Sequence, residues 1–251
     1  MVGKAYMGTS GWVYPAWKLS WYEGRPARTW LGYIDEKLGA VEVDGTFYRQ
    51  QKKETFEKWA SQVSPDFKFA IRGHRYITHR KKLLDVADSV QRVKEPALGL
   101  GNKLGAVLWQ LPPFMKKNAD RLRTFAEQLQ TWPGVWHVME FRNTSWFDKE
   151  IAGILEEFNL VNCISDAGSF ERWDAVTADA VYVRLHGKPN TYWDWYTEDE
   201  LADWGKKVTN WTREGREVYV YFDNDAQGAA PWNALKLNEI VGGVGSRVSL
   251  L

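Results

Sequence analysis

The sequence contains a single cysteine, Cys163, in 251 residues. One thiol excludes a disulfide framework and every zinc or iron–sulfur site that needs several cysteines. No stretch approaches the ~18 apolar residues of a membrane-spanning helix, and no apolar signal segment follows Met1. Neither sign of charge is in excess, since 33 Lys and Arg oppose 32 Asp and Glu. These shortages exclude a uniformly basic nucleic-acid coat, and they predict a cytoplasmic protein with no membrane segment and no inferable obligate protein partner.

Aromatic residues, in contrast, are abundant, with 15 Trp, 11 Tyr and 11 Phe. Such rings either fill a core or stack on sugars and bases. The length suits one domain of the larger kind, and no repeat, linker or low-complexity stretch divides the chain. We therefore expect one domain over residues 1–242 and a disordered tail over residues 243–251.

Eight short β-type segments recur along the chain, separated for the most part by amphipathic helix patterns. The segments are Ala5–Gly8, Ala40–Thr46, Lys68–Gly73, Gly105–Leu111, His137–Arg142, Val161–Asp166, Ala180–His186 and Val218–Asp223. The helix patterns cover Trp30–Leu38, Phe56–Val63, Leu83–Val90, Asn118–Leu129, Ile151–Phe158, Thr197–Trp211 and Trp232–Val241. Alternating β and α elements predict a parallel sheet with crossover helices.

Eight such units favour a single α/β (β/α)8 TIM-like barrel. Residues 167–179, between the sixth and seventh strands, are too few and too polar for a crossover helix, so we expect an irregular loop there. A doubly wound open sheet is the alternative. It is disfavoured because Gly8–Trp12, after the first strand, matches neither a G-x-G-x-x-G nor a G-x-x-x-x-G-K phosphate turn.

Polar residues alternate with apolar ones on five of the predicted strands. In a barrel the apolar residues face the helices, so the polar ones point into the lumen. They are Glu42, Asp44, Arg72, His74, Glu140, Arg142, Tyr182, Arg184, His186, Tyr219, Tyr221 and Asp223. Several lie at the carboxyl ends of their strands, where barrel enzymes build their sites, and this predicts a functional site. The alternative for Glu42 and Arg72 is a scaffold ion pair.

The same residues belong to motifs that resemble those of a known family. The motifs are Gly8–Trp12, Val41–Arg49, Ile77–His79, Gln110–Pro113, Glu140–Arg142 with Ser145–Trp146, Arg184–Gly187 and Asn224–Asp225. They resemble the YecE-like family, domain of unknown function 72. The resemblance implies a TIM-like barrel and no established activity. In the family pattern an Asn is usual at the positions of Asp44 and Asp223, and residues 243–251 lie beyond it.

A metal site is the first chemistry to weigh. Only four His are present, and no H-x-H or HExxH spacing occurs. A single divalent ion held by Glu140, Asp44 or Asp223, with or without His186, is the remaining option. It is not favoured, because Arg142 and Arg184 would repel a cation, so the cofactor stays unknown.

Acid–base catalysis without a metal is the second chemistry to weigh. Glu140, next to Arg142 in the lumen, suits a base, and His186 can act as an acid or a base near neutral pH. These two are the candidate catalytic residues. The alternative for Glu140 is an ion pair that orients Arg142.

Anion binding has the strongest local signal, because Arg72–Lys82 concentrates positive charge around Tyr76. Lys81 and Lys82 also suit the solvated face of the next helix. If Glu42 and Asp44 neutralise Arg72, and Glu140 neutralises Arg142, Arg184 remains free to bind phosphate at the mouth. The candidate substrate-binding residues are Trp12, Tyr14, Glu42, Asp44, Arg72, His74, Tyr76, His79, Gln110, Arg142, Trp146, Arg184, Asp223, Asn224 and Asp225.

Among the aromatic residues, Trp12, Tyr14, Tyr76 and Trp146 are predicted to stack a base or a sugar ring. Trp109 is a further candidate wall of the pocket, and Tyr192–Tyr196 a candidate lid. The sequence thus favours a hydrolase acting on a phosphate-bearing substrate such as a nucleotide, a sugar phosphate or nucleic acid. The alternatives are a non-catalytic nucleic-acid or ligand-binding module and a carbohydrate-active enzyme.

Overall fold

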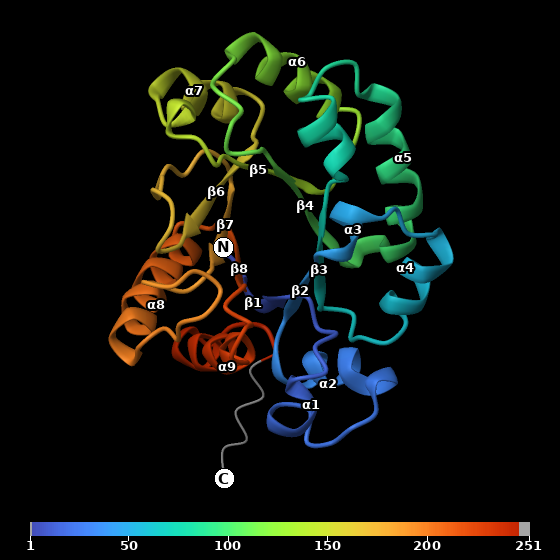
Figure 1. Cartoon of the computed structure of the whole chain (residues 1–251), viewed down its shortest axis with the longest axis vertical. Coiled ribbons are helices and arrows are strands. Elements are labelled where there is room, and N and C mark those ends of the chain that lie inside the picture. Colours follow the sequence, from blue (N-terminus) through green and yellow to red (C-terminus); the bar gives the residue numbers. More distant parts are fainter. Residues whose placement is uncertain (1, 246–251) are drawn as a thin grey trace.

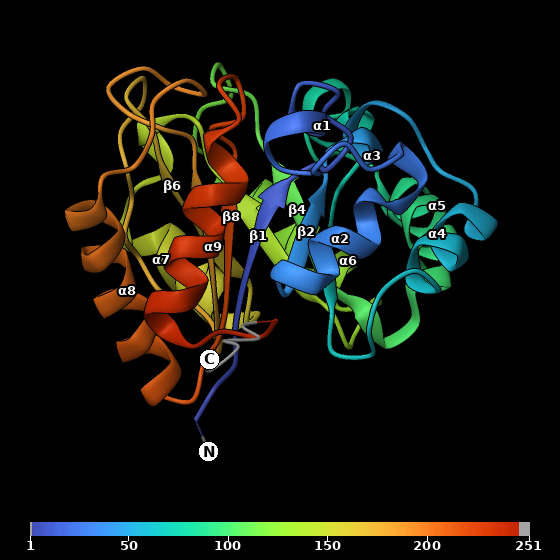
Figure 2. The same cartoon turned by 90° about the horizontal axis from the view of Figure 1, so that it is seen from below.

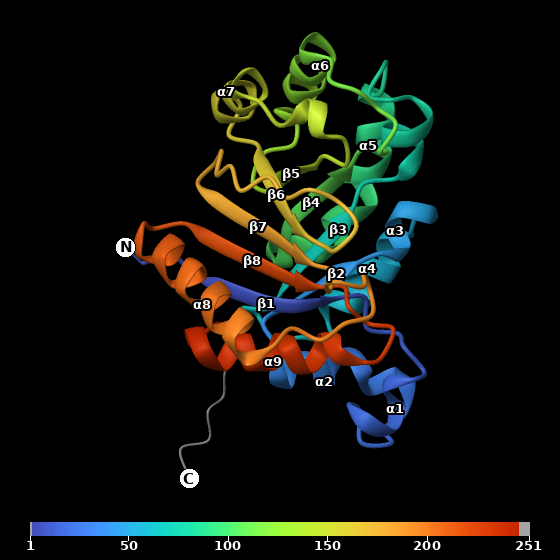
Figure 3. The same cartoon turned by 60° about the vertical axis from the view of Figure 1, so that its left-hand side comes forward.

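Eight parallel strands close into a barrel in which every strand pairs with its neighbours in the sequence, as predicted. The structure, a computed structural model, describes residues 2–245. Figures 1 and 3 show the ring, which closes where β8 pairs with β1. The strands are β1 Ala5–Ser10, β2 Ala40–Val43, β3 Lys68–Arg72, β4 Leu104–Gln110, β5 Trp136–Glu140, β6 Val161–Asp166, β7 Ala180–Leu185 and β8 Glu217–Phe222. This confirms the TIM-like barrel.

Helices cover the outside of the barrel, and in Figure 2 the segments that follow the strands lie at the top, opposite the chain termini. The helices are α1 Trp17–Ser20, α2 Trp30–Lys37, α3 Gly45–Tyr48, α4 Lys53–Ala60, α5 Ala87–Ala97, α6 Ala119–Leu129, α7 Lys149–Glu157, α8 Glu198–Arg213 and α9 Ala229–Val241. Short 3₁₀ turns occur at Ala27–Thr29, Leu98–Lys103 and Thr144–Trp146, and a π-helical turn at Tyr76–Arg80. The segments at the top of Figure 2 surround the mouth of the barrel, where the predicted site residues are concentrated.

Side chains cap the starts of two of the predicted helices. The Asn118 side chain accepts a hydrogen bond from the Arg121 backbone N–H at 2.8 Å, at the start of α6. Thr197 and Glu200 form both halves of a capping box at the start of α8. Each cap satisfies backbone donors that have no partner within the helix.

The third predicted helix is wrong at its beginning. The apolar spacing places Leu83 and Leu84 on the helix, but α5 begins at Ala87. Lys82 and Leu83 have positive φ angles of 50° and 69°, so the backbone turns at the point where a helix was expected. The Leu83 side chain is buried, although its backbone lies in this turn and not in a helix. Lys81 and Lys82 therefore do not lie on a helix face.

No helix joins β6 to β7 within residues 167–179, as predicted. The Asn162 side chain on β6 instead donates to the backbone carbonyls of Trp173 and Ala175, both at 3.0 Å. The Asn162 side chain thus fixes the connection between β6 and β7 to the barrel. In the usual crossover, the packing of a helix on the strands does this.

The chain returns to the barrel after α9. The backbone N–H of Val244 donates to the carbonyl of Ala5 on β1 at 3.0 Å. The remainder of the predicted tail, residues 246–251, lies outside the described residues.

Candidate functional site

A buried guanidinium lies at the centre of the barrel mouth. Arg184, on β7, is 1% exposed. Its Nη2 donates to Glu42 Oε1 at 2.7 Å and to Asp223 Oδ2 at 2.9 Å, and its Nη1 approaches Glu140 Oε1 at 3.4 Å. The three carboxylates come from β2, the residue after β8, and β5. A buried cation is costly unless it is paired, and Arg184 is paired on every side.

This arrangement corrects two expectations. Glu42 pairs with Arg184, whereas Arg72 pairs with Asp44, so the predicted Glu42–Arg72 pair is wrong. Arg184 is also not free at the mouth, because Glu42, Glu140 and Asp223 occupy its donors. The strand register accounts for the first difference, because Glu42 lies opposite Ala70 on β3, two residues before Arg72.

Glu42 is enclosed and fully engaged. It is 0% exposed, and its Oε2 accepts a hydrogen bond from the Tyr182 hydroxyl at 2.5 Å. Its Oε1 accepts from the Ser10 hydroxyl in addition to Arg184. With no oxygen left for a ligand, Glu42 is placed to hold Arg184.

Glu140 is also enclosed at 0% exposure. It accepts hydrogen bonds from Arg142 Nη2 at 2.6 Å and from Ser165 Oγ at 2.7 Å. Burial would raise the pKa of Glu140, but Arg142 and Arg184 outweigh it and hold that pKa well below its usual range. Glu140 therefore stays ionised and surrounded by its partners.

His186, just past β7, bridges the two sides of this network. Its Nε2 lies 3.7 Å from Glu140 Oε1, and its Nδ1 lies 3.0 Å from Asp223 Oδ2. The edges of Phe170 and Tyr192 cover the imidazole, with ring centroids at 5.5 and 5.4 Å. His186 is 0% exposed, so a substrate reaches it only if these rings move.

Asp44 lies nearer the rim, with 27% of its side chain exposed. Arg72 Nη1 donates to its Oδ1 at 2.8 Å, and its Oδ2 lies 2.9 Å from Ser10 Oγ, whose hydroxyl proton is already donated to Glu42. Arg72 also donates to Gln110 and lies 4.3 Å over the Phe47 ring. The rim therefore carries an accessible carboxylate beside a fixed arginine.

Asp44 and Asp223 have pKa values displaced in opposite directions. Burial, Asp223 and Glu42 raise the pKa of Asp44 from 3.8 to about 6. Burial also disfavours ionised Asp223, but Arg184 and His186 overcome it and lower the pKa of Asp223. Both carboxylates are close to Arg184 Nη2, at 3.8 Å for Asp44 and 2.9 Å for Asp223. Paired carboxyl groups with separated pKa values are typical of acid–base chemistry.

A groove of about 620 Å³ opens beside this centre. It is lined by Phe47, His74, Arg75, Tyr76, His79, Arg80 and Phe114. His79 meets the Phe47 ring edge-on at 5.1 Å, and burial with Arg72 and Arg75 lowers its pKa. Phe47 lines the groove and also contacts Arg72, which pairs with Asp44, so one side chain separates the groove from this ion pair.

The predicted aromatic walls fall into two groups. Tyr76 is 46% exposed and lines the groove. Trp12, Trp109 and Trp146 are core residues, at 8%, 0% and 0% exposure, and are wrong as stacking surfaces at this site. The Trp146 ring stacks on Phe141 with centroids 5.0 Å apart, and its Nε1 donates to the Met115 carbonyl at 2.8 Å.

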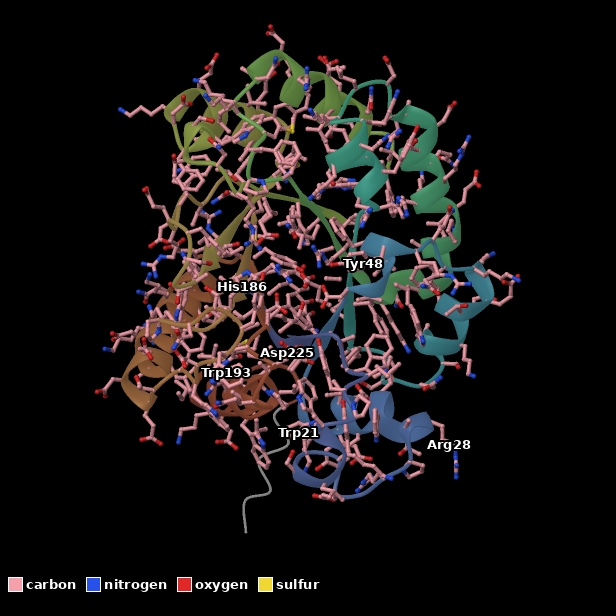
Figure 4. All side chains as sticks on the ribbon, viewed as in Figure 1. Trp21, Arg28, Tyr48, His186, Trp193 and Asp225 are labelled. Atoms are coloured by element: carbon pink, nitrogen blue, oxygen red, sulfur yellow. The ribbon has the colours of Figure 1, made fainter. Side chains whose placement is uncertain are left out.

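The remaining predicted residues have supporting positions. The Tyr14 hydroxyl donates to the Ser10 carbonyl at 2.6 Å. Asn224 is 0% exposed and donates to the Asp194 carbonyl at 2.9 Å, which holds the segment after β7. Burial and Asp223 raise the pKa of Asp225. Figure 4 shows Asp225 and His186 toward the middle of the ring, with Trp193 on the left and Tyr48 on the right.

Sequence reasoning missed several participants. Ser10 and Ser165 hold the buried carboxylates Glu42 and Glu140. Both lie on inward-facing positions of their strands, which was the available signal. Phe170, whose ring lies 4.1 Å from the Arg142 guanidinium, comes from the irregular 167–179 segment and had no such signal.

Two further findings concern only residues 2–245. No group of three or more His, Cys, Asp or Glu side chains there is arranged to hold a metal ion. No helix in that part of the chain is long and apolar enough to cross a membrane.

Comparison with known proteins agrees with the resemblance noted in the sequence. The family model described as "Protein of unknown function DUF72" matches residues 6–249, including most of the 243–251 segment that we expected to lie beyond the family pattern. UPF0759 protein YunF of Bacillus subtilis (strain 168) is 24% identical over 276 residues, which cover 94% of each chain.

Two solved structures are similar over nearly their whole length. A DUF72 family protein from Thermotoga maritima has a TM-score of 0.82 and 26% identity, covering 95% of this chain and 99% of that chain. A DUF72 family protein from Enterococcus faecalis has a TM-score of 0.81 and 20% identity, covering 95% of both chains. The family match over residues 6–249 shows that the chain belongs to the DUF72 family of proteins of unknown function.

Proposed function

We propose that this protein is a hydrolase that acts on a phosphate-bearing substrate at the mouth of the barrel. The observation that carries the proposal is the pair Asp44 and Asp223. They are the more accessible carboxylates of the network, at 27% and 14% side-chain exposure, whereas Glu42 and Glu140 are at 0%. Their pKa values move apart, which suits one acid and one base.

In this proposal Asp44 is the general acid and Asp223 the general base. Ionised Asp223 accepts a proton from a water molecule, whose oxygen attacks the scissile centre. Protonated Asp44 gives its proton to the leaving oxygen as the ester bond breaks. One water is consumed, and the proton on Asp223 returns to Asp44 through solvent.

The residues first considered catalytic have a positioning role in this scheme. Glu140 fixes Arg142 and Arg184, and His186 lies against Asp223. Loss of either should change the pH profile as well as the rate, because each sets the charge around Asp223.

The groove supplies the preference for phosphate. His74, Arg75 and Arg80 line it, and Phe47 connects it to Arg72 and Asp44. Charge-assisted hydrogen bonds from arginine to phosphate are among the stronger polar contacts, at ~1.5–3 kcal/mol each. A substrate with phosphate in the groove would have its neighbouring bond beside Asp44.

Hydrolysis of nitrophenyl esters tests the proposal. We expect release of nitrophenol from p-nitrophenyl phosphate or bis(p-nitrophenyl) phosphate, with a rate that falls as the pH rises through about 6. Asp44→Asn should abolish it, whereas Asp203→Asn, an exposed aspartate on α8, should not. Retention of full activity by Asp44→Asn would refute the acid assignment.

A carbohydrate-active enzyme is the second candidate. Trp193 and Trp195, in the segment after β7, are 51% and 47% exposed and could stack a sugar, and two carboxylates can also hydrolyse a glycosidic bond. Cleavage of p-nitrophenyl glycosides, with the phosphate esters untouched, would favour this candidate. Turnover of neither class, with ligand binding retained, would favour a non-catalytic binding module.

A further inference from the structure

The segments around the barrel mouth are divided by charge. Residues 44–53, 73–86 and 111–118, which follow β2, β3 and β4, contain nine Lys and Arg and only two acidic residues, Asp44 and Asp85, of which Asp44 is paired with Arg72. Residues 167–172, 186–197 and 223–228, just past the carboxyl ends of β6, β7 and β8, contain four Asp and Glu and two Lys and Arg. The near-zero charge of the whole chain conceals this separation. One side of the mouth therefore attracts anions and the other repels them.

Most of the nine cations have no carboxylate of their own. Lys53 pairs with Glu57, and Lys117 pairs with Asp148 and Glu150. The other seven make no ion pair within the part of the chain that the structure describes. They are Arg49, Lys52, Arg75, Arg80, Lys81, Lys82 and Lys116. Their positive charge is available to a ligand.

Each of the three basic segments also presents one exposed aromatic ring. Tyr48, Tyr76 and Phe114 are 63%, 46% and 65% exposed. Tyr76 and Phe114 line the groove of about 620 Å³, and Tyr48 meets Phe47 of that groove edge-on at 4.9 Å. A single exposed ring needs no explanation, but three rings among unpaired cations around one groove form a patterned surface.

We infer that this basic, aromatic face binds single-stranded nucleic acid, with phosphates on the cations and unstacked bases on the rings. Such proteins combine a positive groove with aromatic side chains on which bases stack. In a duplex the base faces are already stacked on one another, so the three rings would have no partner there. A mononucleotide would use one ring and one or two cations, whereas seven unpaired cations over three segments suit a chain of phosphates.

This inference rests on the proposed function in one respect, since it names the substrate class for the same groove. The acidic segments after β6 to β8 give the strand a defined path, because repulsion keeps its phosphates on the side of β2 to β4. That path passes Phe47, and so brings the strand beside Asp44 and Arg72.

Fluorescence anisotropy of the full chain with a labelled oligothymidylate tests the inference. We expect binding that weakens with salt, with a slope of log K against log salt of about −0.7 for each phosphate contact. The double variant Arg75→Gln/Arg80→Gln should bind at least about tenfold more weakly and reduce that slope by about 1.4. Lys206→Gln, on α8, is the matched control for charge and should change neither quantity.

The aromatic variants distinguish binding that includes base stacking from purely electrostatic binding of a polyanion. Tyr76→Ala and Phe114→Ala should each weaken binding about tenfold, within the range for one base–aromatic stack, and leave the salt slope unchanged. Trp232→Ala, which removes an exposed ring on α9 at 42%, is the control and should have no effect. All three rings are exposed, so these variants are expected to fold.

Three results would overturn the inference. They are no binding at low salt, equal or tighter binding of a blunt duplex of the same length, and aromatic variants that bind like the wild type. Measuring oligonucleotide binding and phosphate-ester turnover on the same protein separates this inference from the proposed hydrolase. Oligonucleotide binding without turnover of any phosphate ester supports the inference and refutes the hydrolase. Turnover of a nitrophenyl phosphate without oligonucleotide binding does the reverse.

Discussion

Asp44 should make the folded protein less stable as the pH rises, and its replacement by Asn should remove that loss. Its pKa is raised from 3.8 to about 6 in the folded state by burial, Asp223 and Glu42. Because the folded pKa is the higher one, Asp44 contributes stability that is fully present below about pH 4 and lost as the pH rises through about 6. A shift of about 2 pKa units corresponds to ~3 kcal/mol. Asn cannot ionise, and its carbonyl oxygen can still accept from Arg72, so Asp44→Asn should gain up to ~3 kcal/mol over the wild type above pH 7.

Urea unfolding between pH 4 and pH 8 measures this difference. Asp223→Asn is the matched control with the opposite sign, because Arg184 and His186 overcome burial and lower the pKa of Asp223. Ionised Asp223 therefore contributes stability above its unfolded pKa, and the contribution is lost as the pH falls. Asp223→Asn should be destabilising at pH 7 and less so at low pH. If the difference between Asp44→Asn and the wild type stayed constant or shrank as the pH rose, our account of this carboxylate would be wrong.

Three further predictions concern stability at neutral pH. Arg184→Met should cost ~3–5 kcal/mol in urea unfolding, because it leaves Glu42 and Glu140 buried with too little positive charge; a loss below ~1 kcal/mol would contradict the paired network. Gly73→Ala should cost ~1–3 kcal/mol, since a Cβ would lie 2.2 Å from the Trp109 ring. Gly153→Ala, on α7 with nothing within 4 Å, should instead gain up to ~1 kcal/mol, and equal effects at the two glycines would refute the packing argument. Thr197→Ala should cost ~0.5–2 kcal/mol by removing the cap of α8, and an unchanged thermal midpoint would show that the cap contributes nothing.

The barrel could be predicted from the sequence because strand alternation is a local property. Each strand of this barrel has one face against the helices and one in the lumen. The alternation between the two faces is complete within the four to seven consecutive residues of a strand. The start of α5 could not be predicted in the same way. Leu83 has helical spacing from Ala87, yet it is buried by a turn with positive φ, and spacing alone does not distinguish these two backbones.

The members of the site were more predictable than their partners. Alternation placed Arg184, Glu140 and Glu42 in the lumen, where they do meet. It could not say that Glu42 faces Arg184 instead of Arg72, because the choice depends on depth along the barrel axis. The exposure of individual aromatic rings could not be predicted from the sequence either. Trp146 and Phe114 both follow strand ends, but one is at 0% exposure and the other at 65%.

The connections made by Arg184 have a consequence for how the barrel comes apart. Arg184 is separated from Glu42 by 142 residues and from Ser10 by 174, so these contacts join distant parts of the chain. Contacts of such separation form only after long loops have closed, and we expect them to be absent until β8 docks on β1. Interactions that are missing from the folding transition state slow unfolding and leave the folding rate nearly unchanged. The buried network should therefore govern the lifetime of the closed barrel, and with it resistance to proteolysis, more than the speed at which the barrel forms.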